Sequence, residues 1–334
     1  MMAEWLTTVD TLFHPFSVSL TLLLALLLDA LFGEAKHFHY LVGFGYLSDV
    51  VELTLNPNKA ALDNVEHPLI RSRYAVFLGF IAWLFLVLPL SVIYYFWLND
   101  FDWYGQIVVD AFILYLALGG RSLKEHAMQV YRPLLKGDMK SARQFTGYLV
   151  SRETETLSDN EMSRATVESV LENGHDSVIA SLTYYVIGGI PLVIIHRLAN
   201  TLDAMWGYKT ARYLSFGFAS ARLDDLLGFI SGKICTVLYA MQGSFILALK
   251  NAYQQGNQYK SHNGGWVMSA GATVLCRVIG GKASYHGDSL CSPIMGIGQP
   301  VNIDDIPRST DLVKRASIGF VLIVFGYQLV TYFY

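Results

Sequence analysis

The segment VIASLTYYVIGGIPLVIIHRL, residues 178–198, decides how this chain is expected to fold. It is apolar enough for a membrane, but Gly188, Gly189 and Pro191 lie at its middle, and glycine and proline interrupt helices. Each half is about ten residues long, whereas a helix needs about twenty residues to cross a bilayer. The sequence therefore predicts a re-entrant or membrane-embedded hairpin that returns the chain to the side it left.

The composition of the whole chain is that of a polytopic membrane protein. Of 334 residues, 53% are hydrophobic and only 15% are charged, and the mean hydropathy of +0.37 is too high for an ordinary soluble protein. A formal net charge of -3 without any long basic run argues against a nucleic-acid partner. The three cysteines are widely spaced, which indicates neither a disulfide framework nor a zinc site.

We expect an all-α fold in which residues 1–334 form a single integral membrane domain. It should contain about four to six transmembrane helices, the hairpin and a helical hydrophilic region at 120–177 that carries half of the site. The candidate spans cover residues 16–32, 74–98, 107–118, 230–249 and 316–334. Two intervening stretches, 33–73 and 280–307, are predicted to be loops because they are rich in turn-forming Asn, Pro and Gly.

The hydrophilic region is predicted to contain three helices. Pro133 should stop the first helix, and Asp138 can cap the second. Ser158 and Glu161 have the spacing of a capping box for the third helix. We expect that helix to end at Gly174, because glycine commonly follows a helix C-terminus.

Arg164, Glu168, Glu172 and Asp176 recur every four residues, so a helix would stack three carboxylates on one face. Like charges at this spacing repel, and acids near a helix C-terminus oppose the macrodipole. A charge run is usually a solvated helix face, but this helix adjoins membrane segments and also carries Asn173. We therefore interpret the run as a site for Mg²⁺ or an amine, since Mg²⁺ is commonly bound by carboxylates together with phosphate oxygens.

A second polar region, residues 198–229, would share a face with these carboxylates if the hairpin forms. Its polar residues include Asn200, Asp203, Arg212, Arg222, Asp224 and Asp225. The paired acids can equally be a helix cap that complements the dipole, whereas the arginines could grip a phosphate or carboxylate. Gly119-Gly120-Arg121 is a further, weak indication of an anion site at a helix N-terminus.

Few other residues point to chemistry. Asp29 and Asp110 are ionisable groups in or near predicted spans, where such groups are often functional. His175 and His286 could act as acids or bases, although a lone histidine is more often a hydrogen-bonding surface residue. The chain has no Walker A, GxSxG or HExxH motif, so the common phosphate-loop, hydrolase and zincin classes have no support.

Several separate motifs, in order along nearly the whole chain, resemble the adenosylcobinamide-phosphate synthases of cobalamin biosynthesis. They are Leu118-Gly-Gly-Arg-Ser-Leu-Lys-Glu-His126, Arg152-Glu-Thr, Thr166-Val-Glu-Ser-Val-Leu-Glu-Asn173 with Asp176, Asn200-Thr-Leu-Asp203 with Gly207-Tyr208, Ala221-Arg-Leu-Asp-Asp225, Asn263-Gly-Gly-Trp266, Gly280-Gly281 and Tyr285-His286-Gly287. Such a set is far more specific than any single short pattern.

The resemblance implies a multi-pass enzyme of the bacterial inner membrane, with its active site on the cytoplasmic side. It would use ATP and Mg²⁺ to join the carboxylate of adenosylcobyric acid, a corrinoid substrate, to the amine of aminopropanol phosphate or ethanolamine phosphate. Other cobalamin-assembly membrane enzymes are conceivable partners, beside the bilayer itself.

From the residues and this resemblance together, we assign roles to the polar positions. The catalytic candidates are Glu168, Glu172, Asp176 and Asp203, and the candidate Mg²⁺ ligands are Glu172, Asp176, Asp224 and Asp225. The candidate substrate and phosphate contacts are Arg121, Arg152, Asn173, Asn200, Arg212, Arg222, Asn263, Tyr285 and His286.

The chain departs from the family pattern at Glu34, Tyr40, Ser177 and Ser181, where the family usually has other residues. Two other functions remain alternatives. A non-catalytic membrane regulator, of the type that regulates β-lactamase, would not need to keep the carboxylate set. A transporter would need polar residues at broken helices that line a path through the membrane, and Gly188 to Pro191 is the feature that suggests one.

Overall fold

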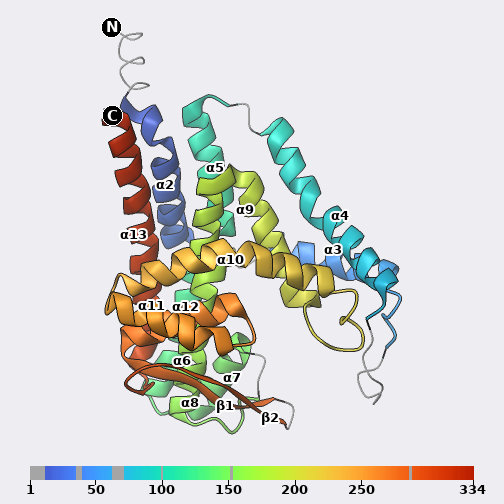
Figure 1. Ribbon diagram of the computed structural model, residues 1–334, viewed down its shortest axis with the longest axis vertical. Coiled ribbons are helices and arrows are strands. Elements are labelled where there is room, and N and C mark those ends of the chain that lie inside the picture. The colour runs from blue at the N-terminus through green and yellow to red at the C-terminus, as the bar shows by residue number, and fades with distance from the viewer. Residues whose placement is uncertain (1–11, 35–39, 62–70, 99–100, 151–152, 286–287) are drawn as a thin grey trace.

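The computed structural model describes residues 12–34, 40–61, 71–98, 101–150, 153–285 and 288–334, and it is built mainly from helices (Figure 1). The helices are η1 (His14–Phe16), α2 (Ser17–Phe32), α3 (Tyr40–Leu55), α4 (Arg73–Trp97), α5 (Trp103–Ala117), α6 (Gly120–Leu135), α7 (Met139–Leu149), α8 (Asp159–Gly174), η2 (His175–Ile179), α9 (Ala180–Trp206), α10 (Phe218–Ala240), α11 (Phe245–Gln254), η3 (Gly256–Gln258), α12 (His262–Leu275) and α13 (Asp305–Phe333). The strands are β1 (Arg277–Tyr285), β2 (Asp288–Gly296) and β3 (Gln299–Pro300).

The elements form an apolar half and a lobe. The apolar half contains α2, α4, α5, α9 and most of α13, and both described ends of the chain lie at its outer edge (Figure 1). The lobe contains α6, α7, α8, α11, α12 and the sheet, while α10 lies across the boundary between the two parts (Figure 1). The polytopic helical fold that the sequence predicts is confirmed.

Five helical stretches in the described residues are long and apolar enough to cross a membrane. They are His14–Phe32, Arg73–Phe96, Trp103–Leu135, Asp159–Trp206 and Asp305–Phe333. The stretch from Asp159 includes α8, a π-helical turn and both arms of α9. Residues 230–249, which the sequence analysis treats as a span, are instead divided between α10 and α11, because the chain turns at residues 241–244.

The predicted hairpin forms within α9. Gly188 (φ −157°, ψ 27°) and Gly189 (φ 64°, ψ −161°) leave the helical conformation, and the two arms run in opposite directions (Figure 1). The rings of Tyr184 on one arm and His196 on the other stack with centroids 5.1 Å apart. The tip stops short of the outer ends of α5 and α13 (Figure 1), which is the geometry of a re-entrant element.

The local signals of the hydrophilic region are partly confirmed. Ser158 and Glu161 form the capping box of α8, and the Asp138 side chain accepts a hydrogen bond from the backbone N–H of Ser141 at the start of α7. Helix α8 ends at Gly174 as expected, but this glycine is itself helical and is not a C′ residue, so the chain continues through the π-helical turn η2 into α9. Pro133 lies inside the last turns of α6 and does not stop that helix before it.

Two stretches that the sequence indicates to be loops contain regular structure. Helix α3 lies within residues 33–73, and the antiparallel pair of β1 and β2 occupies most of residues 277–296. Gly280 (φ 83°) and Gly281 (φ 86°) lie inside β1, where the register with β2 shifts between Ile279 and Gly281. The glycines thus mark an irregularity in a strand, which a sequence pattern does not distinguish from a loop.

Substituting Gly189 tests the hairpin. Gly189→Ala places a side chain at a positive φ that L-residues rarely adopt, and we expect it to lower the free energy of unfolding by about 1–3 kcal/mol. Thermal unfolding in detergent micelles measures this loss. Gly319→Ala in α13 is the control, since a Cβ there meets no atom within 4 Å. Equal melting temperatures for the two variants would contradict a strained turn at Gly189.

Candidate functional site

The base of the hairpin brings acidic side chains together from both of its flanks. Asp176 precedes the first arm, Asp203 lies near the end of the second arm, and Asp224 comes from α10. Burial raises the pKa of Asp224 well above its usual range, and the negative charges of Asp176 and Asp203 raise it further. A hydrogen bond from the Asn200 side chain opposes this effect. We call Asp176, Asp203 and Asp224 the acidic centre.

A buried hydrogen-bond chain positions Asp176. The Nδ1 atom of His175 lies 2.6 Å from Asp176 Oδ1, and its Nε2 atom lies 2.9 Å from the Ser231 hydroxyl of α10. His175 and Ser231 are both buried, so this serine has no room to attack a substrate although the arrangement has the order of a Ser-His-Asp triad. Because His175 lies in the π-helical turn, this turn orients the His175 ring toward α10.

The sequence analysis considers His175 only as an acid or base, and it does not consider Ser231 at all. A histidine beside an acid in the chain gives little indication of a hydrogen bond between them. Ser231 is even less conspicuous, since it is one of several small residues on α10 and lies 56 positions from His175. Only the packing of α10 against the π-helical turn brings the two together.

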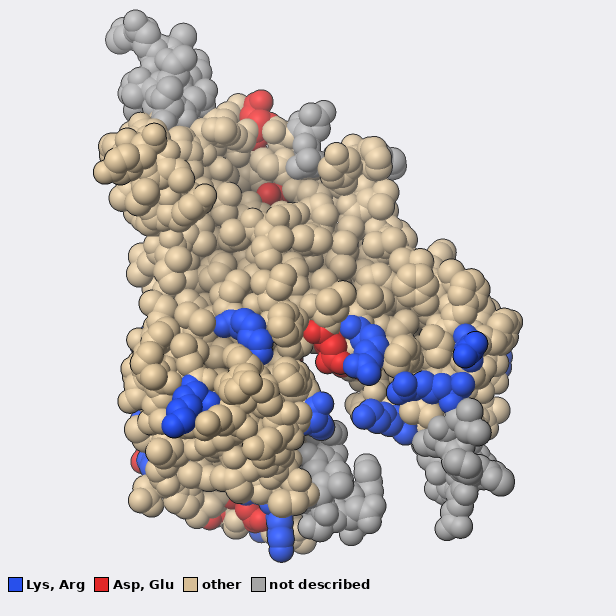
Figure 2. Space-filling view, viewed as in Figure 1, with Lys and Arg blue, Asp and Glu red and all other residues tan. Residues whose placement is uncertain are grey.

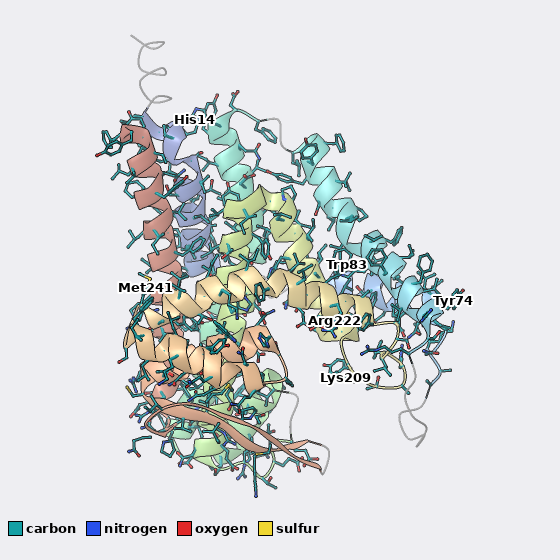
Figure 3. All side chains as sticks on the ribbon, viewed as in Figure 1. His14, Tyr74, Trp83, Lys209, Arg222 and Met241 are labelled. Carbon is teal, nitrogen blue, oxygen red and sulfur yellow. The ribbon has the colours of Figure 1, made fainter. Side chains whose placement is uncertain are left out.

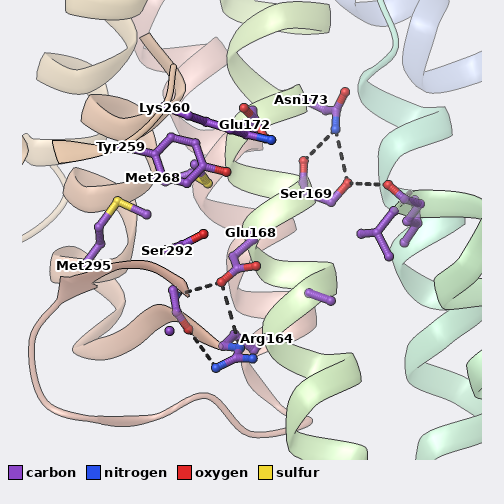
Figure 4. A pocket seen from close by; sticks show the side chains of 15 residues that line it. Arg164, Glu168, Ser169, Glu172, Asn173, Tyr259, Lys260, Met268, Ser292 and Met295 are labelled. Atoms are coloured by element: carbon purple, nitrogen blue, oxygen red, sulfur yellow. Dashed lines mark hydrogen bonds and ion pairs between the residues drawn. The ribbon is translucent and has the colours of Figure 1, made fainter. Parts of the chain in front are cut away.

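A polar pocket lies along α8, which supplies several of its lining residues (Figure 4). Its volume is about 170 Å³. It is lined by Leu149, Val150, Arg164, Ala165, Glu168, Ser169, Glu172, Asn173, Tyr259, Lys260, Met268, Gly280, Gly281, Ser292 and Met295. Both signs of charge line it, so the pocket suits a small zwitterion better than a simple anion or cation.

The predicted carboxylate ladder is divided between two tasks. Glu168 Oε1 accepts a hydrogen bond of 2.8 Å from the Gly280 N–H, and the Arg164 guanidinium donates to the carbonyl groups of Gly280 and Lys282. This pair therefore anchors β1 to α8. Glu172 lies one turn farther along α8, where its carboxylate interacts electrostatically with Asp176, Lys260 and Glu168. The Lys260 side chain extends toward Glu172 (Figure 4), so this acid connects the pocket with the acidic centre.

The anion site predicted at Gly119-Gly120-Arg121 is filled by the chain itself. Asp29 Oδ2 accepts a hydrogen bond of 3.0 Å from the Arg121 N–H at the start of α6. The Arg121 side chain is bonded to Glu125 and to the carbonyl groups of Ala30 and Leu31 at the end of α2. These contacts join α2 to α6 and give Arg121 a structural role, in place of the predicted phosphate contact.

Arg212 is also committed to another part of the fold. Its Nε atom donates a hydrogen bond of 2.9 Å to Glu52 on α3, and Nη2 forms an ion pair with the same carboxylate. The carboxylate draws the pKa of Arg212 upward, and Glu52 is only 1% exposed. This arginine therefore holds α3 against the segment after α9, and the structure does not bring it to the acidic centre.

The remaining predicted contacts are placed as follows. Asn173 donates to the Ser169 carbonyl with a 2.9 Å hydrogen bond and lines the pocket. Asn263 donates to the Asp225 carbonyl and so fixes α12 to α10. Arg222 is exposed, with Nη1 3.8 Å from Asp225 Oδ2. Arg152 and His286 fall outside the described residues, and only the backbone of Tyr285 is described.

The four predicted Mg²⁺ ligands are not assembled as a ready-made cage. In the part of the chain that the structure describes, no three His, Cys, Asp or Glu side chains are arranged to hold a metal ion. Glu172 lines the pocket, and Asp225 is paired with Arg222. Such an arrangement still fits Mg²⁺ that arrives with a nucleotide, because Mg²⁺ often takes one or two carboxylates and completes its shell with phosphate oxygens and water.

A wide notch opens beneath α10, between the lobe and the arm formed by α3, α4 and residues 207–217 (Figure 2). Acidic and basic atoms meet at its roof (Figure 2), where Figure 3 places Arg222, and Lys209 lies on the arm side. The acids near the start of α10 are thus close to this notch, because Asp225 is paired with Arg222.

Comparison with known proteins identifies the family of this chain. The family model described as CobD/Cbib protein matches residues 22–313, which is most of the chain. The chain belongs to the CobD/Cbib family. The cobalamin biosynthesis protein CobD of Stutzerimonas stutzeri is 42% identical over 310 residues, which cover 92% of this chain and 97% of that protein. The CobD protein of Chromobacterium violaceum is 40% identical over 302 residues, covering 89% and 92%. No solved structure matches the chain.

The four residues that the sequence analysis treats as departures from the family pattern make hydrogen bonds within the fold. Glu34 accepts from the Ser122 hydroxyl at 2.7 Å, and the Tyr40 hydroxyl donates to the Leu116 carbonyl at 2.9 Å. The Ser177 and Ser181 hydroxyls donate to the carbonyls of Asn173 and Ala117, at 2.6 Å and 3.4 Å. None of these residues is a member of the acidic centre.

Because the three carboxylates lie close together, we predict that their repulsion lowers the free energy of unfolding. Because folding raises the pKa of Asp224, the folded chain holds that proton more tightly than the unfolded chain, and stability falls as the pH rises above about 4. We expect Asp224→Asn to raise the melting temperature near neutral pH by about 2 °C or more, with a smaller gain in acid.

Thermal unfolding across a pH series checks this expectation. Glu155→Gln, at an exposed carboxylate in the loop before α8, is the matched control and should leave the melting curve unchanged at every pH. A lower melting temperature for Asp224→Asn near neutral pH would show that its charge stabilises the fold.

Proposed function

We propose that this CobD/Cbib protein forms an amide bond between the carboxylate of adenosylcobyric acid and the amine of aminopropanol phosphate or ethanolamine phosphate, with ATP as the energy source. The acidic centre carries the proposal, because three carboxylates meet at the base of the hairpin beside a pocket with charges of both signs. Family membership and relatives that are named for cobalamin biosynthesis support the same reaction.

A carboxylate does not react with an amine until it has a better leaving group. In the proposed reaction, the corrinoid carboxylate takes the terminal phosphoryl group of ATP, which releases ADP and gives an acyl phosphate. The free amine then attacks the acyl carbon, the amide forms, and phosphate leaves. Mg²⁺ would shield the negative charge of the nucleotide, with Asp176, Asp203 or Asp224 supplying one or two of its ligands.

The amine must lose a proton before it can attack. Glu172 is the residue we assign to this step, because it lines the pocket and is also acted on by the charge of Asp176 in the acidic centre. Lys260 would attract the phosphate end of the same small molecule. A pocket of about 170 Å³ suits an aminoalkyl phosphate and is far too small for a corrin, which we assign to the notch beneath α10.

The distribution of basic residues supports an orientation in the inner membrane in which the lobe faces the cytoplasm. Residues 74–120, which contain α5 and nearly all of α4, have no Lys or Arg, and neither have residues 316–334 at the end of α13. On the face shown in Figure 2, the basic atoms lie in the lower part of the molecule. Since Lys and Arg accumulate on the cytoplasmic side, the proposed site would face the compartment that holds ATP.

Neither alternative function accounts for the arrangement as well. A transporter needs polar groups along a path through the membrane, but Asp110 in the apolar half is enclosed by hydrogen bonds from Tyr94, Gln106 and Tyr185. A non-catalytic regulator would gain nothing from three mutually repelling acids. Substrate-dependent ADP release by the purified protein separates the enzyme from both.

Asp203→Asn and Glu172→Gln test the proposed reaction. We expect each variant to lower the rate of product formation by at least about a hundredfold, because a charge or a base is removed without a change in shape. Mass spectrometry of the amide product in reconstituted membranes is the measurement, with Glu155→Gln as the control. Full conversion by stably inserted variants would disprove the assignment of this site.

Lys260→Gln tests the pocket separately. Loss of a charge-assisted contact with phosphate should raise the KM for the aminoalkyl phosphate about tenfold or more and leave the KM for ATP unchanged. The exposed Lys250 on α11 provides the control Lys250→Gln. If the KM for ATP rises instead, the pocket binds the nucleotide.

A further inference from the structure

Helix α10 presents an unpartnered apolar stripe. Leu226, Phe229, Ile230, Val237 and Met241 at the end of the helix are between 39% and 69% exposed. They recur at intervals of three, four and seven residues, which places them on one face. An apolar face of this length is unfavourable in water, so it indicates contact with something apolar.

The opposite face of α10 is already packed. Its buried positions are mostly small, among them Gly228, Ser231, Gly232, Cys235 and Thr236. Asn263 of α12 lies so close that a Cβ added at Gly228 would be 2.5 Å from its Nδ2 atom. Because this face is held against α9 and α12, the exposed stripe cannot turn inward to join the core.

The place of α10 in the fold identifies what covers the stripe. The helix lies across the inner ends of the apolar helices, at the boundary with the lobe (Figure 1). In Figure 2 the surface of the apolar half above this boundary is almost entirely tan, without basic residues. A second copy of the chain would cover an apolar stripe anywhere on the surface. A bilayer covers the stripe only if it lies at the boundary between the apolar half and the lobe, which is where it is found.

Lys233 shows the depth at which the helix lies. It is the one charged residue between Leu226 and Met241, and its Nζ atom lies 3.0 Å from the centroid of the Trp266 ring. Lysine that bends its ammonium out of an apolar surface, next to tryptophan, is typical of the membrane–water interface. Burial lowers the pKa of Lys233 to about 8, which agrees with a partly desolvated ammonium.

We propose that α10 is an in-plane interfacial helix, with the stripe from Leu226 to Met241 inserted at the acyl boundary of the leaflet on the lobe side. The inference does not depend on the amide-forming reaction. It places Asp224 and Asp225, at the start of the same helix, at the level of the lipid headgroups, so that a substrate could reach them from the membrane surface.

Spin labels on α10 test the proposal in liposomes. The label is attached at Ile230→Cys after the exposed Cys276 and Cys291 are changed to serine, and Glu155→Cys is the water-exposed control. Collision rates are measured with oxygen, which concentrates in lipid, and with a water-soluble nickel complex. We expect the oxygen-to-nickel ratio to rise from below one at position 155 to above one at position 230.

Two results would overturn the proposal. A ratio below one at position 230 would mean that the stripe faces water. Dipolar broadening between labels at position 230, which dilution with unlabelled protein removes, would mean that a second copy covers it. The same measurement at Leu226→Cys guards against a local distortion at position 230, and thermal unfolding establishes that each labelled protein is folded.

Discussion

The break at Gly188 and Gly189 is the feature on which the rest of this architecture depends, because it folds α9 back on itself and prevents one straight helix from Asp159 to Trp206. Gly189 takes a positive φ and sends the second arm of α9 back toward the lobe. The ends of both arms then lie on one side of the apolar half, together with the start of α10 (Figure 1). Without the turn, Asp176 and Asp203 would be separated by the thickness of the membrane.

The acidic centre that results has an electrostatic cost. Three carboxylates repel one another at the base of the hairpin, while a buried chain from Ser231 through His175 fixes Asp176 in place. His175 and the positive charge of Arg197 attract Asp176 and offset part of this repulsion, whereas Asp305 is paired directly with both Arg277 and Arg308. A functional centre commonly has this cost in stability.

Signals carried by neighbouring residues were predictable from the sequence. The hairpin follows from Gly188 and Gly189, and the caps of α7 and α8 follow from Asp138 and Ser158, because each depends on the chemistry of a few adjacent positions. The meeting of the two polar regions was predictable only as a consequence of the hairpin.

Pairings between distant segments were not predictable. The sequence indicates a phosphate contact for Arg212 because nothing in it marks Glu52, 160 positions away, as the partner of this arginine. The sequence indicates a catalytic role for Glu168 because its pattern does not predict β1, whose Gly280 N–H donates a hydrogen bond to this carboxylate. The pairing of Arg121 with the end of α2 is also long-range. Asp29 accepts a hydrogen bond from the first turn of α6, and the Arg121 side chain donates to carbonyl groups at the end of α2. In each case the three-dimensional partner lies on an element that local patterns describe as a loop or as a separate span.

The π-helical turn at His175–Ile179 has one more consequence. In an uninterrupted α-helix, Glu168, Glu172 and Asp176 would stay in phase on a single face. The wider turn shifts this phase, so that Glu168 and Glu172 line the pocket while Asp176 joins the acids of the hairpin base and α10. A single helix can therefore supply carboxylates to both the pocket and the acidic centre, because one irregular turn changes the direction in which the next carboxylate points.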